Sequence, residues 1–306
     1  LPDRSDYLVH VKDVLARHGV GERPVVFWVY PKCLDFPEIA RALTPDLTVA
    51  DVVDDHRTWA RPGTSQYQRI VAHYQEIAEL SDITLTNCDA MRTTMAALGG
   101  NVHLVPNAAE YPDLSLSLAL DVPDELRALE GPTVGYVGNL SSRIDVDLLE
   151  HLARSRPHWN IVLVGSAHAG QEVLRLRSLR NVSLLGPRPY EEAKRYVRAF
   201  DVGLIPHLDD EMTAAMHPLK AFVYCALDVP VVSTDVANLG ELRPLISVAT
   251  DHAEFLAKVD AALAEGKAPL AREGAQDVLR RNSWEVRTGA VVALVDEALG
   301  ERDVLR

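Results

Sequence analysis

A lysine stands at the start of a predicted helix, where its charge is unfavourable. The segment HPLKAFVYCALDVPVVST, residues 217–234, predicts a helix over 218–227 that leads into a buried strand. Lys220 falls in the first turn, where the positive end of the helix macrodipole makes a cation unfavourable by about 0.3–1 kcal/mol. An anion bound between this helix start, His217 and Lys220 would make the charge favourable. A diphosphate is the natural candidate.

Loops after other predicted strands carry residues that suit the same ligand. Gly138 follows the strand 133–139, and Arg143 precedes the next helix, where its guanidinium could reach a phosphate. An ordinary strand-to-helix turn explains this loop equally well. His207 directly follows the strand 201–206, and a histidine at such a point is as often a hydrogen-bonded cap as a functional group.

Two further loops offer backbone rather than charge. Gly165 ends a strand in LVGSAHAG (163–170), whose small residues would let a ligand pass close by. Gly186 and Arg188, in the loop that begins at 184, could flank a nucleobase.

Acidic residues form two clusters that could do chemistry. Asp54, Asp55 and His56 end the predicted strand 47–54 and could orient an acceptor hydroxyl or supply a general base; a polar loop is an equal alternative. Asp145 and Asp147 have the D-x-D spacing that can hold a divalent metal. Because both fall at a helix start, we expect them to cap the helix.

The composition excludes several classes of protein. The chain has 306 residues, 47% of them hydrophobic, and a formal net charge of −13, which argues against a nucleic-acid partner and against adsorption to anionic lipid. Its three cysteines show no CxxC spacing, so we expect neither a disulfide framework nor a zinc site, and we expect a reducing cytoplasm. No apolar run approaches the roughly 20 residues of a membrane-spanning helix, and we expect no signal peptide.

Short apolar runs alternate with amphipathic segments along the chain. This pattern predicts an α/β protein with parallel sheets that are covered on both faces. The predicted strands are 25–30, 47–54, 82–86, 102–106, 133–139, 160–166, 181–186, 201–206 and 229–234. The predicted helices are 36–43, 66–80, 88–98, 145–155, 189–199 and 218–227, and residues 251–299 are expected to be helical throughout.

The alternation breaks once, at residues 111–132, which contain three prolines. We therefore predict an N-terminal domain over 1–110, a linker over 111–132 and a second domain over 133–282. A C-terminal helix over 283–306 is expected to pack back toward the first domain. Two doubly wound domains facing a cleft is the predicted architecture, with ligands outside the carboxyl ends of the strands.

The motifs, taken in order, resemble a known family. G-N-L, L-V-G, G-x-R-P-Y, D-V-x-L-I-P and P-L-K-x(9)-P-V-V-S-T are similar to the nucleotide-sugar-binding half of GT-B glycosyltransferases. The match is greatest to the retaining, family 4 (group 1) type of bacterial polysaccharide and teichuronic-acid synthesis. The segments VVFWVYP, ADVVDDH, DITLTNC and LVPNAAEY resemble the acceptor domain of that subgroup, without the strand and glycine-rich loop with which it usually starts. The N-terminal domain is therefore expected to be incomplete.

The resemblance implies roles for the residues above. Arg143 and Lys220 would hold the leaving diphosphate without a metal or cofactor, and His207 would lie near the transferred sugar. Asp54, Asp55 and His56 would face the acceptor. The expected donor-binding residues are Gly138, Asn139, Arg143, Gly165, Gly186, Arg188, His217, Lys220 and Val223. Val223 and Ala215 occupy positions where related enzymes have glutamates, the first of which holds the donor ribose.

The expected function is transfer of a sugar from a nucleotide-diphosphate sugar to a saccharide or lipid-linked acceptor hydroxyl. A catalytically degenerate homologue that serves a glycosyltransferase as a non-enzymatic partner is an alternative, favoured by Val223 and Ala215. A nucleotide-sugar 2-epimerase is a further alternative. We expect the protein in the cytoplasm, with the inner face of the membrane or a glycosyltransferase as a partner.

Overall fold

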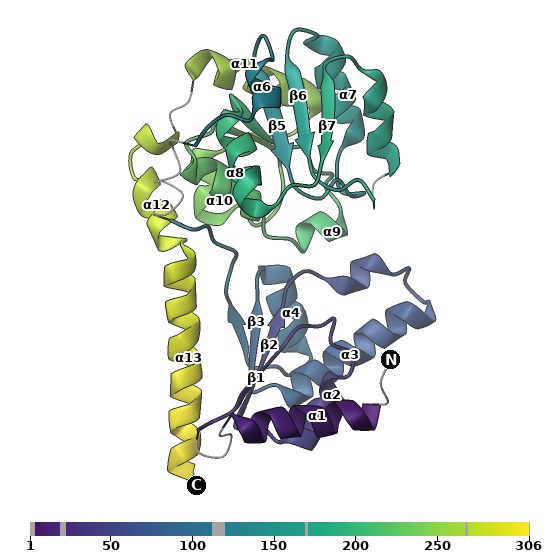
Figure 1. Ribbon diagram of the computed structural model, residues 1–306, viewed down its shortest axis with the longest axis vertical. Helices are drawn as coiled ribbons and strands as arrows, with labels where there is room; N and C mark the ends of the chain where they lie inside the picture. The colour runs from purple at the N-terminus through teal and green to yellow at the C-terminus, as the bar shows by residue number, and fades with distance from the viewer. Residues whose placement is uncertain (1–3, 19–22, 112–119, 169–170, 267–268, 306) are drawn as a thin grey trace. The chain divides into compact units, whose positions relative to one another are not determined.

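The chain forms two compact units. The computed structural model describes residues 4–18, 23–111, 120–168, 171–266 and 269–305. The first unit contains the described residues up to Pro106 and those from Thr288 onward, and the second contains Asn107–Arg287 (Figure 1). Each unit is built on its own parallel sheet.

The first unit has a four-stranded parallel sheet in the order β1-β2-β3-β4. Its strands are β1 (Val26–Val29), β2 (Leu47–Val52), β3 (Ile83–Thr86) and β4 (Val102–Leu104). Its helices include α1 (Arg4–Arg17), α2 (Phe36–Leu43), η1 (His56–Trp59), α3 (Ser65–Leu80) and α4 (Asp89–Ala97). Right-handed crossovers join successive parallel strands in such sheets, so successive helices can share one face.

Side chains alternate between the two faces of this sheet. Ala50 and Val52 pack with Tyr74, Ile77 and residues of α2 and α4 on one side. Leu47, Val49, Ile83 and Leu85 form the other core, which is covered by Val291, Leu294 and Val295 of α13 (Trp284–Leu305). The C-terminal helix thus shields a face that would otherwise expose apolar strand residues.

The second unit has a six-stranded parallel sheet in the order β10-β9-β8-β5-β6-β7. Its strands are β5 (Thr133–Val137), β6 (Asn160–Val164), β7 (Val182–Gly186), β8 (Val202–Ile205), β9 (Val231–Thr234) and β10 (Ser247–Ala249). The chain winds from β5 to β7 in one direction and then returns to β8 on the other side of β5. The winding therefore reverses between β5 and β8, and ligands bind beyond the carboxyl ends of strands at such a point.

Helices and short turns surround this sheet, with apolar cores on both sides. They are α6 (Asp124–Arg127), α7 (Val146–Ser155), η3 (Gln171–Ser178), α8 (Tyr190–Ala199), α9 (Glu211–Ala214), α10 (Leu219–Ala226), η4 (Gly240–Leu245), α11 (His252–Glu265), η5 (Pro269–Ala271) and α12 (Ala275–Arg281). Asp145 caps α7 as expected, because its carboxylate accepts a hydrogen bond of 2.8 Å from the Leu148 amide.

All nine predicted strands are present, and the differences lie in the connections. The division between the units falls after Pro106 rather than at 110, and Tyr111 and Leu126 are buried in the core of the second unit. The described part of the expected linker 111–132 therefore belongs to that unit, and residues 112–119 lie outside the described residues. The expectation of continuous helix over 251–299 was wrong, because α11, α12 and α13 are separate.

Two glycines bring the loops after β5 and β6 into contact. The Gly138 amide donates to the Val164 carbonyl at 2.9 Å, and the Gly165 amide donates to the Gly186 carbonyl at 2.9 Å, so pairing continues past the strand ends. Gly165 has φ +153°, and a Cβ built there would lie 1.7 Å from the Gly138 carbonyl oxygen. Gly165 is thus required by packing between two loops.

We predict that Gly165→Ala destabilises the protein by more than about 3 kcal/mol. It combines a backbone penalty of about 1–2 kcal/mol with overpacking of about 1–3 kcal/mol. Gly186→Ala is the matched control, because Gly186 also has a positive φ, +73°, but nothing lies within 4 Å of its built Cβ. Calorimetric melting of both variants checks this. Equal destabilisation by the two changes would show that the loop contact contributes nothing.

Candidate functional site

Lys220 turns toward the carboxyl end of β5. Its Nζ lies 5.1 Å from the centroid of the Tyr136 ring. A Cβ built at Gly138 would lie 3.3 Å from the Lys220 Cε, so a side chain at residue 138 would crowd the lysine. The charge at the start of α10 therefore lies over the strand end at the point where the winding reverses.

His207 and Tyr136 form a buried polar pair beside this lysine. The Tyr136 Oη and the His207 Nε2 are 3.3 Å apart, and His207 is only 1% exposed. Burial lowers the pKa of His207 well below its usual value, and the charges of Lys220 and Arg143 lower it further. Burial raises the pKa of Tyr136. Both rings are therefore neutral at neutral pH.

The loops after β5 and β8 hold this pair in place. The Leu208 amide donates to the Arg143 carbonyl at 2.8 Å, and the Thr234 hydroxyl donates to the His207 carbonyl at 2.7 Å. The His207 Nδ1 is buried and has no hydrogen-bond partner among the described residues. A buried nitrogen of this kind is typical of a group that awaits a ligand or water.

Arg143 adds a second cation beside Lys220 at the carboxyl ends of the strands. Its Nη1 lies 2.7 Å from the Met216 Sδ, and its buried Nε has no hydrogen-bond partner within the described part of the chain. Because both Arg143 and Lys220 lower the pKa of His207, the two cations act on the same small volume. This volume favours an anion, although the whole protein is acidic.

His217 lies apart from this group. Its ring stacks on Phe222 with centroids 5.3 Å apart, and its carbonyl accepts a hydrogen bond of 3.0 Å from the Asn107 side chain. Burial, and then the charge of Arg287, lower the pKa of His217 to about 4. The expectation that His217 and Lys220 converge on one anion is not supported, because a neutral, stacked ring packs the start of α10.

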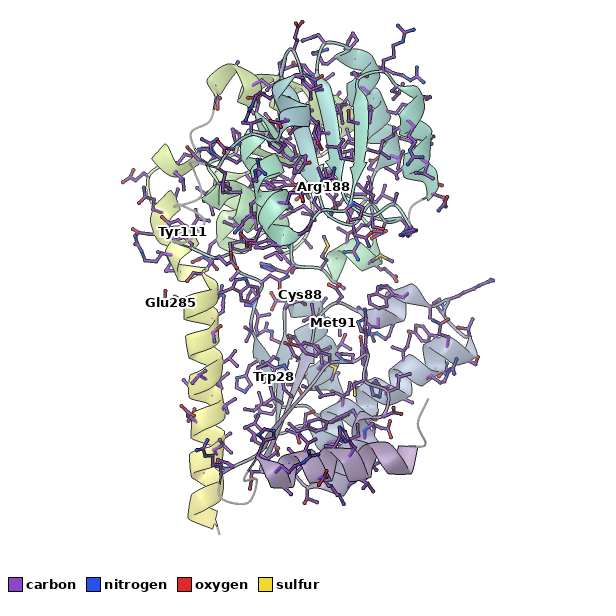
Figure 2. All side chains as sticks on the ribbon, in the orientation of Figure 1. Trp28, Cys88, Met91, Tyr111, Arg188 and Glu285 are labelled. Carbon is purple, nitrogen blue, oxygen red and sulfur yellow. The ribbon has the colours of Figure 1, made fainter. Side chains whose placement is uncertain are left out.

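Arg188 is also engaged elsewhere. Its guanidinium donates to the Tyr196 hydroxyl at 3.1 Å and the Leu185 carbonyl at 2.7 Å, and pairs with Glu125 at 3.2 Å. Arg188 is labelled in Figure 2. These contacts fix the loop after β7 against α8. The geometry therefore gives Arg188 a structural role rather than the expected place beside a nucleobase.

Backbone groups and apolar side chains make up the rest of the predicted donor site. The Asn139 side chain is exposed, and its carbonyl accepts a hydrogen bond from the Tyr136 hydroxyl at 3.3 Å. Gly165 and Gly186 border a cavity of about 250 Å³ at the ends of β6 and β7. Val223 is 8% exposed and borders a different cavity, of about 280 Å³, beside Lys220.

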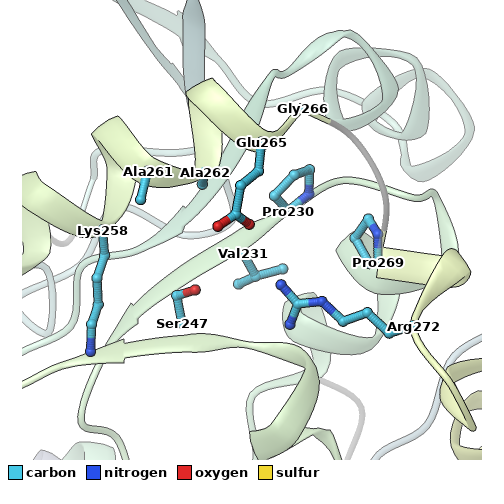
Figure 3. A pocket seen from close by; sticks show the side chains of 10 residues that line it. All are labelled: Pro230, Val231, Ser247, Lys258, Ala261, Ala262, Glu265, Gly266, Pro269 and Arg272. Carbon is cyan, nitrogen blue, oxygen red and sulfur yellow. The ribbon is translucent and has the colours of Figure 1, made fainter.

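A third cavity, of about 270 Å³, lies at the amino ends of β9 and β10, opposite the carboxyl ends of the strands. Figure 3 shows the side chains of Ser247, Glu265 and Arg272 around it. Because ligands of open parallel sheets bind at the carboxyl ends, this cavity is not part of the candidate site.

The predicted acceptor residues lie at the end of β2 in the first unit. Asp55 caps η1 and pairs with Arg57 at 2.7 Å, so its carboxylate is held within its own loop rather than available as a base. His56 stacks on Trp59 with ring centroids 4.0 Å apart. Burial and the charge of Lys32 lower the pKa of His56, which leaves a neutral imidazole. Asp54 adopts φ +62° at the turn that presents both residues.

Among the described residues, no group of three His, Cys, Asp or Glu side chains is placed to hold a metal ion. None of the described helices combines the length and the apolar character needed to cross a bilayer.

Tyr136 and Thr234 are site residues that the sequence does not single out. Tyr136 occupies an ordinary buried position in an apolar strand, and Thr234 ends a strand whose neighbour is fixed only by the fold. A hydroxyl at the carboxyl end of a predicted strand is the one signal that could have indicated them.

The chain is similar to known glycosyltransferases in sequence and in fold. Residues 131–265 match the model of the family described as glycosyl transferases group 1. Over 285 residues the chain is 25% identical to TuaH of Bacillus subtilis (strain 168), named as a teichuronic acid biosynthesis glycosyltransferase, covering 86% of this chain and 70% of that one.

Solved structures extend the likeness to the whole fold. Sucrose-phosphate synthase from Thermosynechococcus elongatus matches with a TM-score of 0.69 and 16% identity, over 96% of this chain and 78% of that one. A trehalose-phosphate synthase (UDP-forming) from Burkholderia vietnamiensis matches with a TM-score of 0.68 and 19% identity, over 98% of this chain and 78% of that one. The chain has the GT-B fold, and residues 131–265 match the group 1 glycosyl transferase family within it.

Proposed function

We propose that Lys220 and Arg143 bind the diphosphate of a nucleotide sugar, whose sugar passes to a hydroxyl of a saccharide or lipid-linked acceptor. The observation that carries this proposal is the orientation of Lys220 over Gly138 and Tyr136. A lysine that served only solubility would extend into water, away from the positive helix end.

The leaving diphosphate needs charge stabilisation, and the second unit offers it without a metal. The amide groups at the start of α10, together with Lys220 and Arg143, present fixed positive charge to an anion at the carboxyl end of β5. Such preorganised charge stabilises the negative charge that develops on the leaving oxygen. We propose a metal-independent transfer on this basis.

His207 is placed to act on the transferred sugar. Its neutral imidazole can donate from one nitrogen and accept at the other, and the Tyr136 hydroxyl fixes one of them. The His207 Nδ1, which has no hydrogen-bond partner among the described residues, is then left for a sugar hydroxyl. Because the pKa of His207 is lowered, this role does not change across neutral pH.

The acceptor side rests on the first unit. We propose that His56, with its lowered pKa, and Asp54 orient the acceptor hydroxyl. The name of the Bacillus relative supports a bacterial polysaccharide as the product. The three cysteines are free thiols, as a reducing cytoplasm keeps them, and we propose that the protein works there, at the inner face of the membrane.

We predict that Lys220→Ala weakens the binding of a nucleoside diphosphate by about 1.5–3 kcal/mol, the range for hydrogen bonds to charged groups. Isothermal titration measures the affinity, and the melting temperature should change little because the lysine is unfavourable for the free helix. Lys258→Ala is the control, since Lys258 borders the cavity at the amino ends of β9 and β10, away from the proposed diphosphate site. Intact affinity in Lys220→Ala would place the diphosphate elsewhere.

We predict that His207→Ala lowers kcat at least tenfold and leaves the affinity for the nucleoside diphosphate within about twofold. The loss corresponds to one hydrogen bond of about 1.4 kcal/mol to the reacting sugar. Tyr136→Phe, which removes only the neighbouring hydroxyl, should cost less. If His207→Ala binds nucleotide normally and retains full kcat, the histidine is a packing residue.

The same assays separate catalysis from a role as a non-enzymatic partner. Sugar transfer by the unaltered protein, measured as release of the nucleoside diphosphate with an oligosaccharide acceptor present, supports the enzyme. Tight nucleotide binding without any release would support the partner that Val223 and Ala215 suggested.

A further inference from the structure

The cavity beside Lys220 has a composition unlike the rest of the site. It measures about 280 Å³ and lies between the end of β5, α8 and α10. The described residues that line it are Val137, Gly138, Tyr190, Ala193, Lys194, Val197, Leu219, Lys220, Val223 and Tyr224. None of these ten residues carries a carboxylate, an amide side chain or an aliphatic hydroxyl.

Two of the polar side chains that border the cavity, Tyr224 and Lys194, have partners. The Tyr224 hydroxyl accepts a hydrogen bond of 2.8 Å from the Val137 amide. The Lys194 ammonium pairs with Glu191 at 2.6 Å and lies over the Tyr190 ring at 5.1 Å. A hydroxyl group that entered this cavity would therefore meet mainly apolar walls, and no carboxylate lines them to accept its proton.

The position of the cavity indicates which part of the donor enters it. This step rests on the proposed function, in which Lys220, one of the residues that line the cavity, binds the diphosphate. A diphosphate carries a nucleoside on one side and a sugar on the other. A hexose has a hydroxyl on nearly every carbon, whereas a nucleobase has two apolar faces. Tyr190, 46% exposed, offers an aromatic ring on which a base can stack.

The pentose of the nucleoside must then lie between the base and the diphosphate, against the wall formed by α10. Val223 is one turn beyond Lys220, so both side chains project from the same face of the helix. A ribose 2′-hydroxyl against this valine would lose its hydrogen bonds to water and gain none. Leaving a hydroxyl unpaired in a buried site lowers affinity by roughly 10- to 100-fold.

We propose that the donor of this glycosyltransferase is a 2′-deoxyribonucleoside diphosphate sugar. The apolar cavity admits the base and the deoxyribose, and Lys220 binds the adjoining phosphate. Val223 is the specificity-determining residue, because it occupies the wall where a ribose hydroxyl would need an acceptor.

The test compares dUDP with UDP, which differ only in the 2′-hydroxyl, by isothermal titration against the full chain. We expect dUDP to bind at least tenfold more tightly. Equal affinity, or tighter binding of UDP, overturns the proposal. The affinities of the Lys220→Ala variant test the proposed function separately. If Lys220→Ala weakens the binding of both dUDP and UDP, the diphosphate site stands whichever nucleotide is preferred. If Lys220→Ala changes neither, the diphosphate site itself is wrong.

Val223→Thr tests the wall directly, since threonine keeps the branched shape of valine and adds a hydroxyl. We expect it to reduce the preference for dUDP at least threefold, through tighter binding of UDP. Val236→Thr is the matched control, because Val236 is 3% exposed and does not line the cavity. An unchanged ratio in Val223→Thr, with both variants folded by melting temperature, would remove Val223 from nucleotide selection.

The choice of donor sugar gives an independent readout. With an oligosaccharide acceptor, kcat/KM for dTDP-glucose should exceed that for UDP-glucose by about the same factor as the affinities of dUDP and UDP. A higher kcat/KM for UDP-glucose would contradict the proposal even if dUDP bound more tightly.

Discussion

The contact between the Gly138 carbonyl and Gly165 is the constraint on which the site depends. Backbone meets backbone there without room for a Cβ, so the loops after β5 and β6 are held together. The ladder of hydrogen bonds continues past both strands into these loops, including the bond from Leu140 to Ser166 at 2.9 Å. The two loops therefore form a fixed surface at the carboxyl ends of β5 and β6. Lys220 lies over the Tyr136 ring beside it, at the point where the sheet reverses its winding.

The local charge at these loops is positive, whereas the protein as a whole is strongly negative. A chain with a net charge of −13 repels anions at long range, yet Lys220 and Arg143 each lie close enough to His207 to lower its pKa. Screening limits the repulsion of distant surface charges to about 8–10 Å at ordinary salt, whereas partly buried cations are screened much less. Local charge therefore decides what binds. His207 remains neutral between the two cations because burial makes a third positive charge too costly.

Much of the fold could be predicted because alternating apolar runs report burial directly, and parallel sheets require such runs. Elements with a weak periodic pattern of apolar residues were not predicted. Strand β10 is only Ser247–Ala249, too short to show a period, and α12 and α13 are separated within what looked like continuous helical sequence. Lys220 could be recognised because it breaks a local rule, and violations of this kind tend to mark functional sites.

Ion pairs in the folded protein occupy two of the residues that were expected in the site. Arg188 looked available for a nucleobase, but its guanidinium pairs with Glu125, a residue that only the folded second unit brings beside it. Asp55 looked like a base, but the neighbouring Arg57 occupies its carboxylate. A charged residue in a strand-end loop is thus a candidate ligand only if no opposite charge pairs with it. The sequence shows a neighbour such as Arg57, but it does not show a distant partner such as Glu125.

Val223 shows that core packing and ligand recognition need not be alternatives. Its apolar spacing on α10 predicts burial, and its side chain does join the core that includes Ala226 and Leu227. The same side chain also lines the cavity beside Lys220. A core residue of this kind acts on specificity by withholding a hydrogen bond. Its replacement by an acceptor would change which nucleotide is favoured while the cationic mouth of the site stays the same.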